Sequence, residues 1–424
     1  MQEIKTIKEL LSFVWNNSNS DFYAKKYKSA GLSKGQVLDE GNFHKLPLLT
    51  RTELESTPPD ERLFVKSDEV EFVAYTSGTT SGNPLVIYFS SVENRYFDPT
   101  LGTGVKRILI VHPPLSRNFG HTFVQQCRQA KNKSTPIFAD YQNLANSAVI
   151  AAKVKADAIC TIPTIAFDFV KHLEKYYDLN SIKLLIVSSE TLTSAKREIL
   201  QEKFPRASIA NVYGSAEVGQ FFLYPCKRIM EEKTDKFHVL QPPILAAELI
   251  DGELVVTHAD NKAMPLIRYR TGDYFEIAGE SCPCGLPGPV LRWSGRENVD
   301  RLRICGVEIK VANVEETFRS ILHLTGDKYQ LHFYEIKENS GFKIKTVIEI
   351  LRENKPTGSL FSEGDISSAV AMHLLDNWIL APRITLRKAV EQNSFAMPEI
   401  KFVDEFSFKS GKMRRLVPHF NESR

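Results

Sequence analysis

Short apolar runs alternate with longer amphipathic segments between about residues 70 and 215, and this alternation constrains the fold more than any other feature of the sequence. The runs typical of buried strands are 107–112, 136–139, 157–161 and 183–188. The segments whose apolar residues have helical spacing are 144–155, 165–177 and 194–204. Buried strands joined by helices predict an α/β fold with a mainly parallel sheet and helices on both of its faces.

The pattern differs on either side of this region. The first 55 residues contain helical segments and polar turns. After about residue 240 the sequence becomes β-rich, and Asp251-Gly252 favours a hairpin turn. The strand segments expected here are 246–250, 253–257, 267–269 and 274–277.

A third pattern follows Gly295, where Asn339-Ser340-Gly341 predicts another hairpin between two alternating segments. The elements expected here are strands at 329–336, 342–351 and 401–406 and a helix at 366–380. We therefore expect a large α/β body with a β-rich subdomain over residues 1–297 and a small α+β domain over residues 298–424. A chain of 424 residues is long enough for both.

Composition narrows the choice of partners and compartment. The 54 Lys and Arg residues nearly balance the 51 Asp and Glu residues, giving a net charge of +3, so we expect neither nucleic acid nor a membrane surface as a partner. No apolar run approaches the ~18 residues of a membrane-spanning helix. The six cysteines are too few for a disulfide scaffold, which predicts a reducing, cytoplasmic location.

Two segments of the large body carry residues suited to a nucleotide. The segment 75–84 combines glycines with hydroxyl side chains, whose donors can surround a polyphosphate. It lacks the Gly-Lys-Ser/Thr of a Walker loop, and a polar turn before the strand at 85–89 is the alternative. In the segment 212–217, Glu217 follows a strand and can hold Mg²⁺, while Tyr213 can stack on a base. A solvated loop glutamate is the alternative there.

Three further segments complete the set of motifs. Asp273 follows Thr271-Gly272 and can accept hydrogen bonds from two hydroxyls, as in a ribose. Gly295-Arg296 leads toward a second glycine segment at 305–309. Near the C-terminus, Lys412 lies beside a glycine in a basic segment at 409–415, where a lysine can be delivered to a reacting phosphate as a point charge; a solvated basic tail is the alternative.

The five motifs stand in one order, and together they resemble those of the adenylate-forming acyl/aryl-CoA synthetase superfamily, most closely its phenylacetate–CoA ligase branch. That branch opens with segments similar to 21–27 and 46–51. It also lacks the lysine that follows the loop proline elsewhere, and this chain has Leu85 there. The resemblance extends from about residue 10 to residue 415.

Two departures from the branch concern spacing. Ser81 is an extra residue in the phosphate loop. The segment from Gly295 to Gly306 is one residue longer than usual, which leaves Asn298 and Asp300 both as candidates for the hinge carboxylate position. These departures affect loop geometry and the hinge more than the class of reaction.

The resemblance implies a reaction in two steps. ATP activates a carboxylic acid, usually an aromatic or arylacetic acid in this branch, to an acyl-adenylate and pyrophosphate. A thiol, usually that of coenzyme A, then displaces AMP to form a thioester, and the small C-terminal domain rotates between the steps. The alternatives are transfer to a carrier protein, an enzyme thiol or an amine, and a non-catalytic nucleotide-binding protein on the same fold. Candidates for a basic surface that would dock a carrier are Lys343, Lys345, Arg383, Arg387 and Lys388.

The resemblance also implies roles for single residues. Glu217 would ligate Mg²⁺, Asp273 would bind the ribose hydroxyls, Arg296 would support ribose or phosphate, and Lys412 would bridge the carboxylate and the α-phosphate. The residues expected to hold the β- and γ-phosphates are Thr76, Ser77, Gly78, Thr79 and Thr80. Those expected near the base are Ser189, Glu190, Asn211, Tyr213, Gly214 and Ser215. The coenzyme A tunnel would include Cys305, Gly306 and Val307.

The acyl pocket is expected near Phe119, Gly120, His121 and Ser188. His121 can contact the substrate carboxylate or Mg²⁺, and a structural role is the alternative. Intact residues at the positions of Glu217, Asp273 and Lys412 favour an active enzyme over a non-catalytic relative.

Four residues of the β-rich region suggest a zinc site. Cys282-Pro283-Cys284-Gly285 resembles a metal knuckle, and similar cysteines occur in some relatives of the branch. Cys226 and His238 would complete a closed tetrahedral set of three cysteines and one histidine. The alternative is reduced surface cysteines around a Pro-Gly turn, and the one-residue gap between the two cysteines is tighter than usual. Cys127 and Cys160 have the character of small core residues.

Overall fold

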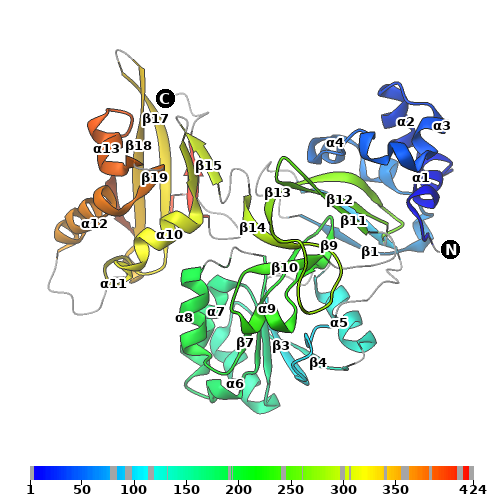
Figure 1. Cartoon of the computed structure of the whole chain (residues 1–424). Helices are drawn as coiled ribbons and strands as arrows, with labels where there is room; N and C mark the ends of the chain where they lie inside the picture. The colour runs from blue at the N-terminus through cyan, green and yellow to red at the C-terminus, as the bar shows by residue number, and fades with distance from the viewer. Residues whose placement is uncertain are drawn as a thin grey trace. The chain divides into compact units, whose positions relative to one another are not determined.

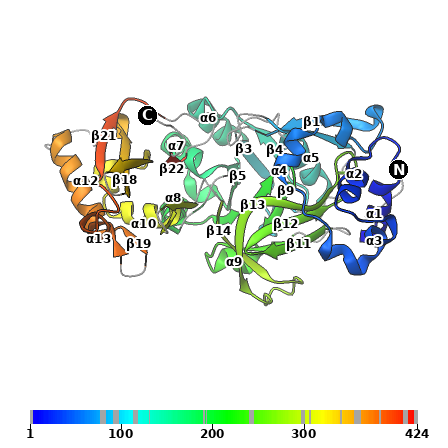
Figure 2. The same ribbon diagram turned by 90° about the horizontal axis from the view of Figure 1, so that it is seen from above.

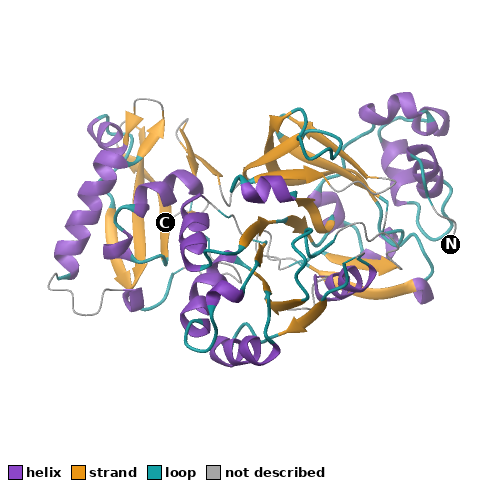
Figure 3. Ribbon diagram, turned by 60° about the horizontal axis from the view of Figure 1, so that its bottom comes forward, coloured by secondary structure: helices purple, strands orange, loops and turns teal. Residues whose placement is uncertain are grey.

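The computed structural model describes residues 4–76, 84–90, 98–112, 119–130, 132–189, 192, 194–239, 245–259, 261–296, 301–304, 307–338, 341–354, 362–381, 384–407 and 414–419 (Figure 1). The chain forms two compact units. The first comprises Met1–Leu192 and Arg197–Ser294, and the second Thr193–Lys196 and Gly295–Arg424. Helices and strands are mixed in both units (Figure 3). The division of the chain into two domains, residues 1–297 and 298–424, stays a prediction.

The first unit begins with helices that gather near the N-terminus (Figure 2). They are α1 (Ile7–Trp15), α2 (Phe22–Ser29), α3 (Lys34–Leu38) and α4 (Arg51–Ser56). Thr50 caps α4 in a reciprocal arrangement: its Oγ1 accepts from the Glu53 backbone N–H at 3.2 Å, and the Glu53 carboxylate accepts from Thr50 N at 2.8 Å. This capping box fixes the start of α4. It thereby places Arg51, the first residue of the helix, beside the site described below.

The four buried strands predicted from the sequence form a five-stranded sheet together with a strand at Ser208–Asn211 that is not predicted; every pair is parallel, and the order is β4-β3-β5-β6-β7. The strands are β3 (Arg107–Val111), β4 (Thr135–Phe138), β5 (Ala158–Thr161), β6 (Leu184–Val187) and β7 (Ser208–Asn211). The accompanying helices are α5 (Phe119–Gln129), α6 (Leu144–Val154), α7 (Pro163–Leu173) and α8 (Ser194–Lys203). The parallel α/β fold is therefore confirmed.

Alternate side chains of this sheet belong to two separate cores. Leu109 and Leu185 pack with residues of α6, α7 and α8, whereas Ile108 and Leu184 pack with residues of α5, β9 (Gly219–Tyr224) and α9 (Lys227–Glu231). Because both faces are covered, the strands are almost continuously apolar, which explains the sequence pattern.

An antiparallel hairpin and a seven-stranded sheet complete the first unit. The hairpin pairs β1 (Val70–Tyr75) with β2 (Val86–Ser90). The larger sheet has the order β11-β12-β13-β14-β10-β9-β8. Its strands are β8 (Tyr213–Ser215), β9 (Gly219–Tyr224), β10 (Lys236–Val239), β11 (Leu245–Ile250), β12 (Glu253–His258), β13 (Leu266–Gly279) and β14 (Val290–Arg296), with α9 (Lys227–Glu231) between β9 and β10.

The expected hairpin at Asp251-Gly252 is confirmed, and both residues have the positive φ that its two-residue turn requires, 51° and 82°. The expectation of two strands at 267–269 and 274–277 is wrong, because both lie in the single 14-residue strand β13. Bonds to β12 maintain the strand across the interval: Thr271 Oγ1 donates to the Leu254 carbonyl at 2.7 Å, and Gly272 N donates to Glu253 Oε1 at 2.9 Å.

The second unit is an α+β structure around the sheet β21-β18-β17-β22. Its elements are β15 (Arg301–Ile304), β16 (Val307–Lys310), α10 (Val311–Arg319), α11 (Leu322–Thr325), β17 (Tyr329–Glu338), β18 (Gly341–Leu351), α12 (Glu363–Asn377), β19 (Ile379–Ala381), β20 (Ile384–Thr385), α13 (Leu386–Glu391), β21 (Glu399–Val403) and β22 (Leu416–Pro418). The predicted hairpin is β17–β18. The predicted helix is α12, although its expected last residues belong to β19. Among the residues described, no helix has the length and apolar character needed to cross a membrane.

Candidate active site

Arg51 links two residues that the sequence analysis assigned to phosphate and Mg²⁺ binding. Glu217 lies in the turn between β8 and β9, and Thr76 directly follows β1. Arg51 Nη1 donates to Glu217 Oε1 at 2.9 Å, and Arg51 Nη2 donates to Thr76 Oγ1 at 3.2 Å. Its Nε donates to Glu55 Oε1 at 2.6 Å. One guanidinium therefore sets the relative position of a carboxylate and a hydroxyl from separate segments.

Thr76 also closes the base of the β1–β2 connection. Its backbone N–H donates to the Leu85 carbonyl at 3.0 Å, and its Oγ1 accepts from Leu85 N at 2.9 Å. Glu217 is held by its own turn, because Ser215 Oγ accepts from Val218 N at 3.1 Å. Both residues are buried, with 8% exposure for Thr76 and 9% for Glu217. The site thus has a rigid base on which a mobile anion can be positioned.

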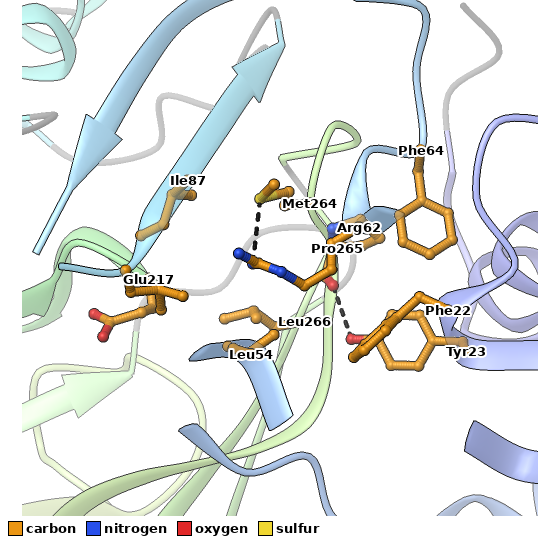
Figure 4. Close-up of a pocket in the computed structure, with 11 residues that line it drawn as sticks. Phe22, Tyr23, Leu54, Arg62, Phe64, Ile87, Glu217, Met264, Pro265 and Leu266 are labelled. Atoms are coloured by element: carbon orange, nitrogen blue, oxygen red, sulfur yellow. Dashed lines mark hydrogen bonds between the residues drawn. The ribbon is translucent and has the colours of Figure 1, made fainter. Parts of the chain in front are cut away.

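A small cavity lies behind Glu217 (Figure 4). Its volume of about 20 Å³ is room for about one water molecule. Glu217 points its carboxylate away from the cavity (Figure 4). Burial lowers the pKa of the Arg62 guanidinium, which reaches Met264 Sδ at 3.7 Å across this space. The remaining lining residues are Phe22, Tyr23, Leu54, Phe64, Leu85, Ile87, Pro265 and Leu266. The cavity is too small to be the substrate site.

Tyr213 and Asp273, expected on the base and ribose respectively, are brought together. The Tyr213 hydroxyl donates to Asp273 Oδ2 at 2.5 Å, although 60 residues separate them. The Tyr213 ring packs edge-on against Phe275, with centroids 5.3 Å apart, and lies 5.9 Å from the ring of Trp293. Asp273 is only 2% exposed. The sheet therefore holds a carboxylate acceptor and an aromatic ring in one fixed pair.

Residues at the carboxyl ends of parallel strands form a polar group next to the sheet. Ser189 follows β6 with a φ of +67°, and its Oγ lies 3.3 Å from His112 Nε2, directly after β3. Ser188 Oγ is 3.5 Å from Ser189 Oγ. Asn211 ends β7 and donates to Asp235 Oδ1 at 3.5 Å. Ligands of open α/β sheets bind at this edge, and the left-handed backbone of Ser189 is a strained conformation of the kind that functional sites retain.

Several expected site residues lie outside the described part of the chain: Ser77, Gly78, Thr79, Thr80, Ser81, Glu190, Asn298, Asp300, Cys305, Gly306 and Lys412. For others the structure describes only the backbone element: α5 for Phe119, Gly120 and His121, β14 for Arg296, and β16 for Val307. Gly214 is part of β8. The roles of all these residues stay predictions.

Sequence reasoning missed Arg51, His112 and Asp235. In the sequence, the segment 46–51 that contains Arg51 only resembles a feature of the branch, and an arginine at the start of a helix is common. Its partner Glu217 lies 166 residues away, so no local spacing could have revealed the contact. His112 is the last residue of the predicted strand at 107–112, and this position at a strand end is the signal that the sequence offers for it.

The expected cluster of Cys226, His238, Cys282 and Cys284 is present, with the four ligand atoms all within 4.8 Å of one another. Sγ of Cys226 lies 3.9 Å from Sγ of Cys282, and Sγ of Cys284 lies 3.5 Å from His238 Nε2. Burial lowers the pKa of His238 and raises the pKa of Cys226 to about 12. The gathering of the four side chains is confirmed, and the metal stays a prediction.

Known proteins share this architecture. The family model of AMP-binding enzymes matches residues 21–254. The chain is 23% identical over 352 residues to phenylacetate-coenzyme A ligase of Escherichia coli strain K12, and 24% identical over 355 residues to the enzyme of the same name from Thermus thermophilus; each match covers 74% of both chains. A crystal structure of 2-hydroxyisobutyryl-CoA ligase in the postadenylation state aligns with a TM-score of 0.72, at 16% identity, over 97% of this chain and 88% of that one. That structure shows a shared fold.

Proposed function

The chain belongs to the AMP-binding enzyme family, and we propose that it activates a carboxylic acid with ATP to an acyl-adenylate and then forms the coenzyme A thioester. The observation that carries this proposal is the group of Arg51, Thr76 and Glu217 inside the segment matched by the family model. The pair of Tyr213 and Asp273 in the adjoining sheet supports it, since it offers a ring and a hydroxyl acceptor to a nucleoside.

The first step joins two anions, so charge neutralisation and positioning must supply most of the catalysis. An oxygen of the substrate carboxylate attacks the α-phosphorus, the bond to the β-phosphate oxygen breaks, and pyrophosphate leaves. Thr76 would donate its hydroxyl to a phosphate, and Arg51 holds that hydroxyl in place. The buried Glu217 carboxylate fits Mg²⁺, which prefers hard oxygen ligands and when bound would neutralise phosphate charge.

Lys412 would add a positive charge between the carboxylate and the α-phosphate in this step. In the second step, the thiolate of coenzyme A attacks the acyl carbon, the carbon–oxygen bond to the phosphate breaks, and AMP leaves. We assign Cys305, Gly306 and Val307 to the path of the coenzyme A arm. Rotation of the C-terminal domain between the two steps would allow one small domain to serve both.

For the substrate we propose an aromatic or arylacetic acid, which the names of the curated relatives support. Salt bridges in the second unit favour coenzyme A over a carrier protein as the acceptor. Two of the five basic residues considered for carrier docking are occupied by carboxylates: Lys345 Nζ lies 2.6 Å from Glu399, and Arg387 Nε lies 2.6 Å from Asp376. These pairs leave less positive charge to attract an acidic carrier.

Acid-dependent ATP–pyrophosphate exchange tests the proposal, with a panel of aryl, arylacetic and short and long aliphatic acids. We expect exchange with one class of acid, and acyl-CoA formation once coenzyme A is added. Lys412→Ala is the control that should abolish exchange. Exchange without acyl transfer to coenzyme A would replace the acceptor by a carrier protein or an amine. Absence of both exchange and ATP binding would favour a non-catalytic relative that keeps the fold but has lost the nucleotide site.

A further inference from the structure

The four ligand atoms of the Cys/His cluster come from three separate segments of the first unit. Cys226 precedes α9, His238 lies in β10, and Cys282 and Cys284 lie in the turn between β13 and β14. His238 is 1% exposed, so its ring is held inside the protein with Nε2 beside the sulfur of Cys284. Among the described residues this is the group of His, Cys, Asp and Glu side chains close enough to share one ion.

Two of the separations between these ligand atoms match the edges of a zinc tetrahedron. Bonds of about 2.3 Å to sulfur and about 2.0 Å to nitrogen place two sulfurs about 3.8 Å apart and a sulfur and a nitrogen about 3.5 Å apart. The observed values are 3.9 Å for Cys226–Cys282 and 3.5 Å for Cys284–His238. A disulfide needs about 2.05 Å between sulfurs, so the first pair is spaced for a shared ion and not for a covalent bond.

The turn that carries two of the ligands is shaped like a metal knuckle. Gly285 has a φ of +84°, a value that suits glycine, and its N–H donates to the Cys282 carbonyl at 3.1 Å. Beyond it, the Leu286 N–H donates to Cys284 Sγ at 3.5 Å. A backbone donor to a sulfur stabilises its thiolate form, the form that binds metal. The C-x-C gap is short, and this turn accommodates it by folding the chain back on Cys282.

We propose that Cys226, His238, Cys282 and Cys284 bind one structural Zn²⁺. Three thiolates and one imidazole fill the four coordination positions of the ion. No position is left for a substrate or a water molecule, so the site is of the structural type and not the catalytic type. The ion ties the β13–β14 turn to β10 and to the segment after β9. Because β13 carries Asp273 and the turn before β9 carries Glu217, the zinc holds together the strands that position the nucleotide residues.

Metal analysis of the full-length protein purified without chelator tests this directly. We expect about one equivalent of zinc per chain. Cys282→Ser should lose at least nine-tenths of it, and its Tm should fall by about 5 °C or more because the bound ion stabilises only the folded state. Ser281→Ala, at the exposed neighbouring position, is the matched control and should keep both the zinc and the Tm.

Two further measurements apply even if Cys282→Ser fails to fold. A mercurial titration of the wild-type protein, with a chromogenic chelator present, should release zinc in step with the modification of three thiols. Wild-type protein loaded with Co²⁺ should show the intense visible absorption of a tetrahedral thiolate site. Absence of zinc, iron in its place, or zinc retained by both variants would overturn the proposal. None of these readouts depends on enzymatic activity, so they test the zinc site separately from the proposed function.

Discussion

Replacing Arg51 by methionine removes the guanidinium that joins Thr76 and Glu217 while keeping a long side chain. Glu217 is the more buried partner, with its side chain 7% exposed against 29% for Arg51. In the variant a buried carboxylate loses its cation. We therefore expect a loss of stability together with a weaker affinity for MgATP, since Thr76 and Glu217 are then no longer held at a fixed separation.

The size of the effect follows from the contact distances. With 2.9 Å between Nη1 and Oε1, the charge centres lie about 4 Å apart, and the attraction is about 4 kcal/mol at an effective dielectric constant of about 20. The desolvation cost of the Arg51 guanidinium disappears in the variant and offsets about half of this attraction, whereas the desolvation cost of Glu217 is the same in both proteins. The hydrogen bond to Thr76 adds about 1 kcal/mol. We expect the unfolding free energy to fall by about 2–3 kcal/mol, and KM for MgATP to rise about tenfold.

Chemical denaturation of wild type, Arg51→Met, Glu217→Gln and the double variant measures the pair in a double-mutant cycle. The expected coupling energy is about 1–2 kcal/mol. Arg292→Met is the matched control, because Arg292 pairs with Glu276 at 3.0 Å but both side chains are about half exposed. Such a pair contributes only about 0–1 kcal/mol. Equal losses for Arg51→Met and Arg292→Met, or a coupling energy near zero, would refute the reasoning.

Three other predictions concern separate parts of the chain. Lys412→Ala should slow adenylate formation by at least a hundredfold while turnover of supplied acyl-adenylate with coenzyme A is largely kept; equal loss in both assays would contradict its role. Tyr213→Phe should lower the unfolding free energy by about 1–2 kcal/mol and weaken ATP binding, because buried Asp273 loses the hydroxyl that donates to it at 2.5 Å; denaturation and ATP titration measure both. The pKa of His332 is lowered by burial, against the opposing effect of Glu349, so unfolded chains take up a proton more readily and stability should decrease as pH falls below about 6.5. Denaturation at pH 7.5 and 5.5 checks this, and an unchanged pH dependence in His332→Gln would count against it.

The fold was predictable where a pattern is local. Four of the five strands of the parallel sheet coincide with apolar runs, and their predicted positions agree with the structure to within about one residue, whereas β7, which has polar residues at both ends, is not predicted. The β17–β18 hairpin was found for the same reason, because its turn residues lie between two alternating segments. The strand β13 was split wrongly since Thr271-Gly272 favours a turn in isolation. Bonds from β12 hold those two residues in the strand, and they come from another part of the sequence.

The candidate site shows the same limit more sharply. Residue types and their order predicted that Tyr213, Glu217 and Asp273 would serve one nucleotide, but not how they are held. The structure shows that the Tyr213 hydroxyl donates to Asp273, so the tyrosine orients this carboxylate, and its stacking on a base stays a prediction. A contact of this kind depends on how strands β8 and β13 are arranged in the seven-stranded sheet, and that arrangement is fixed by pairing between distant segments.

The contact of Arg51 with Glu217 is the clearest example of a feature that the structure shows and the sequence does not. Its side chain is placed by a local signal, the capping box at Thr50 and Glu53, which can be found in the sequence. At this position Arg51 donates to Glu217, which lies 166 residues away in a turn that the Ser215 hydroxyl stabilises. Two local structures, each common by itself, thus meet in one charged contact beside Thr76. If that contact organises the site, the helix cap should act on ATP affinity through Arg51. Thr50→Ala should then raise KM for MgATP in wild type but have little further effect in Arg51→Met, and equal effects in both backgrounds would show that the cap only stabilises the helix.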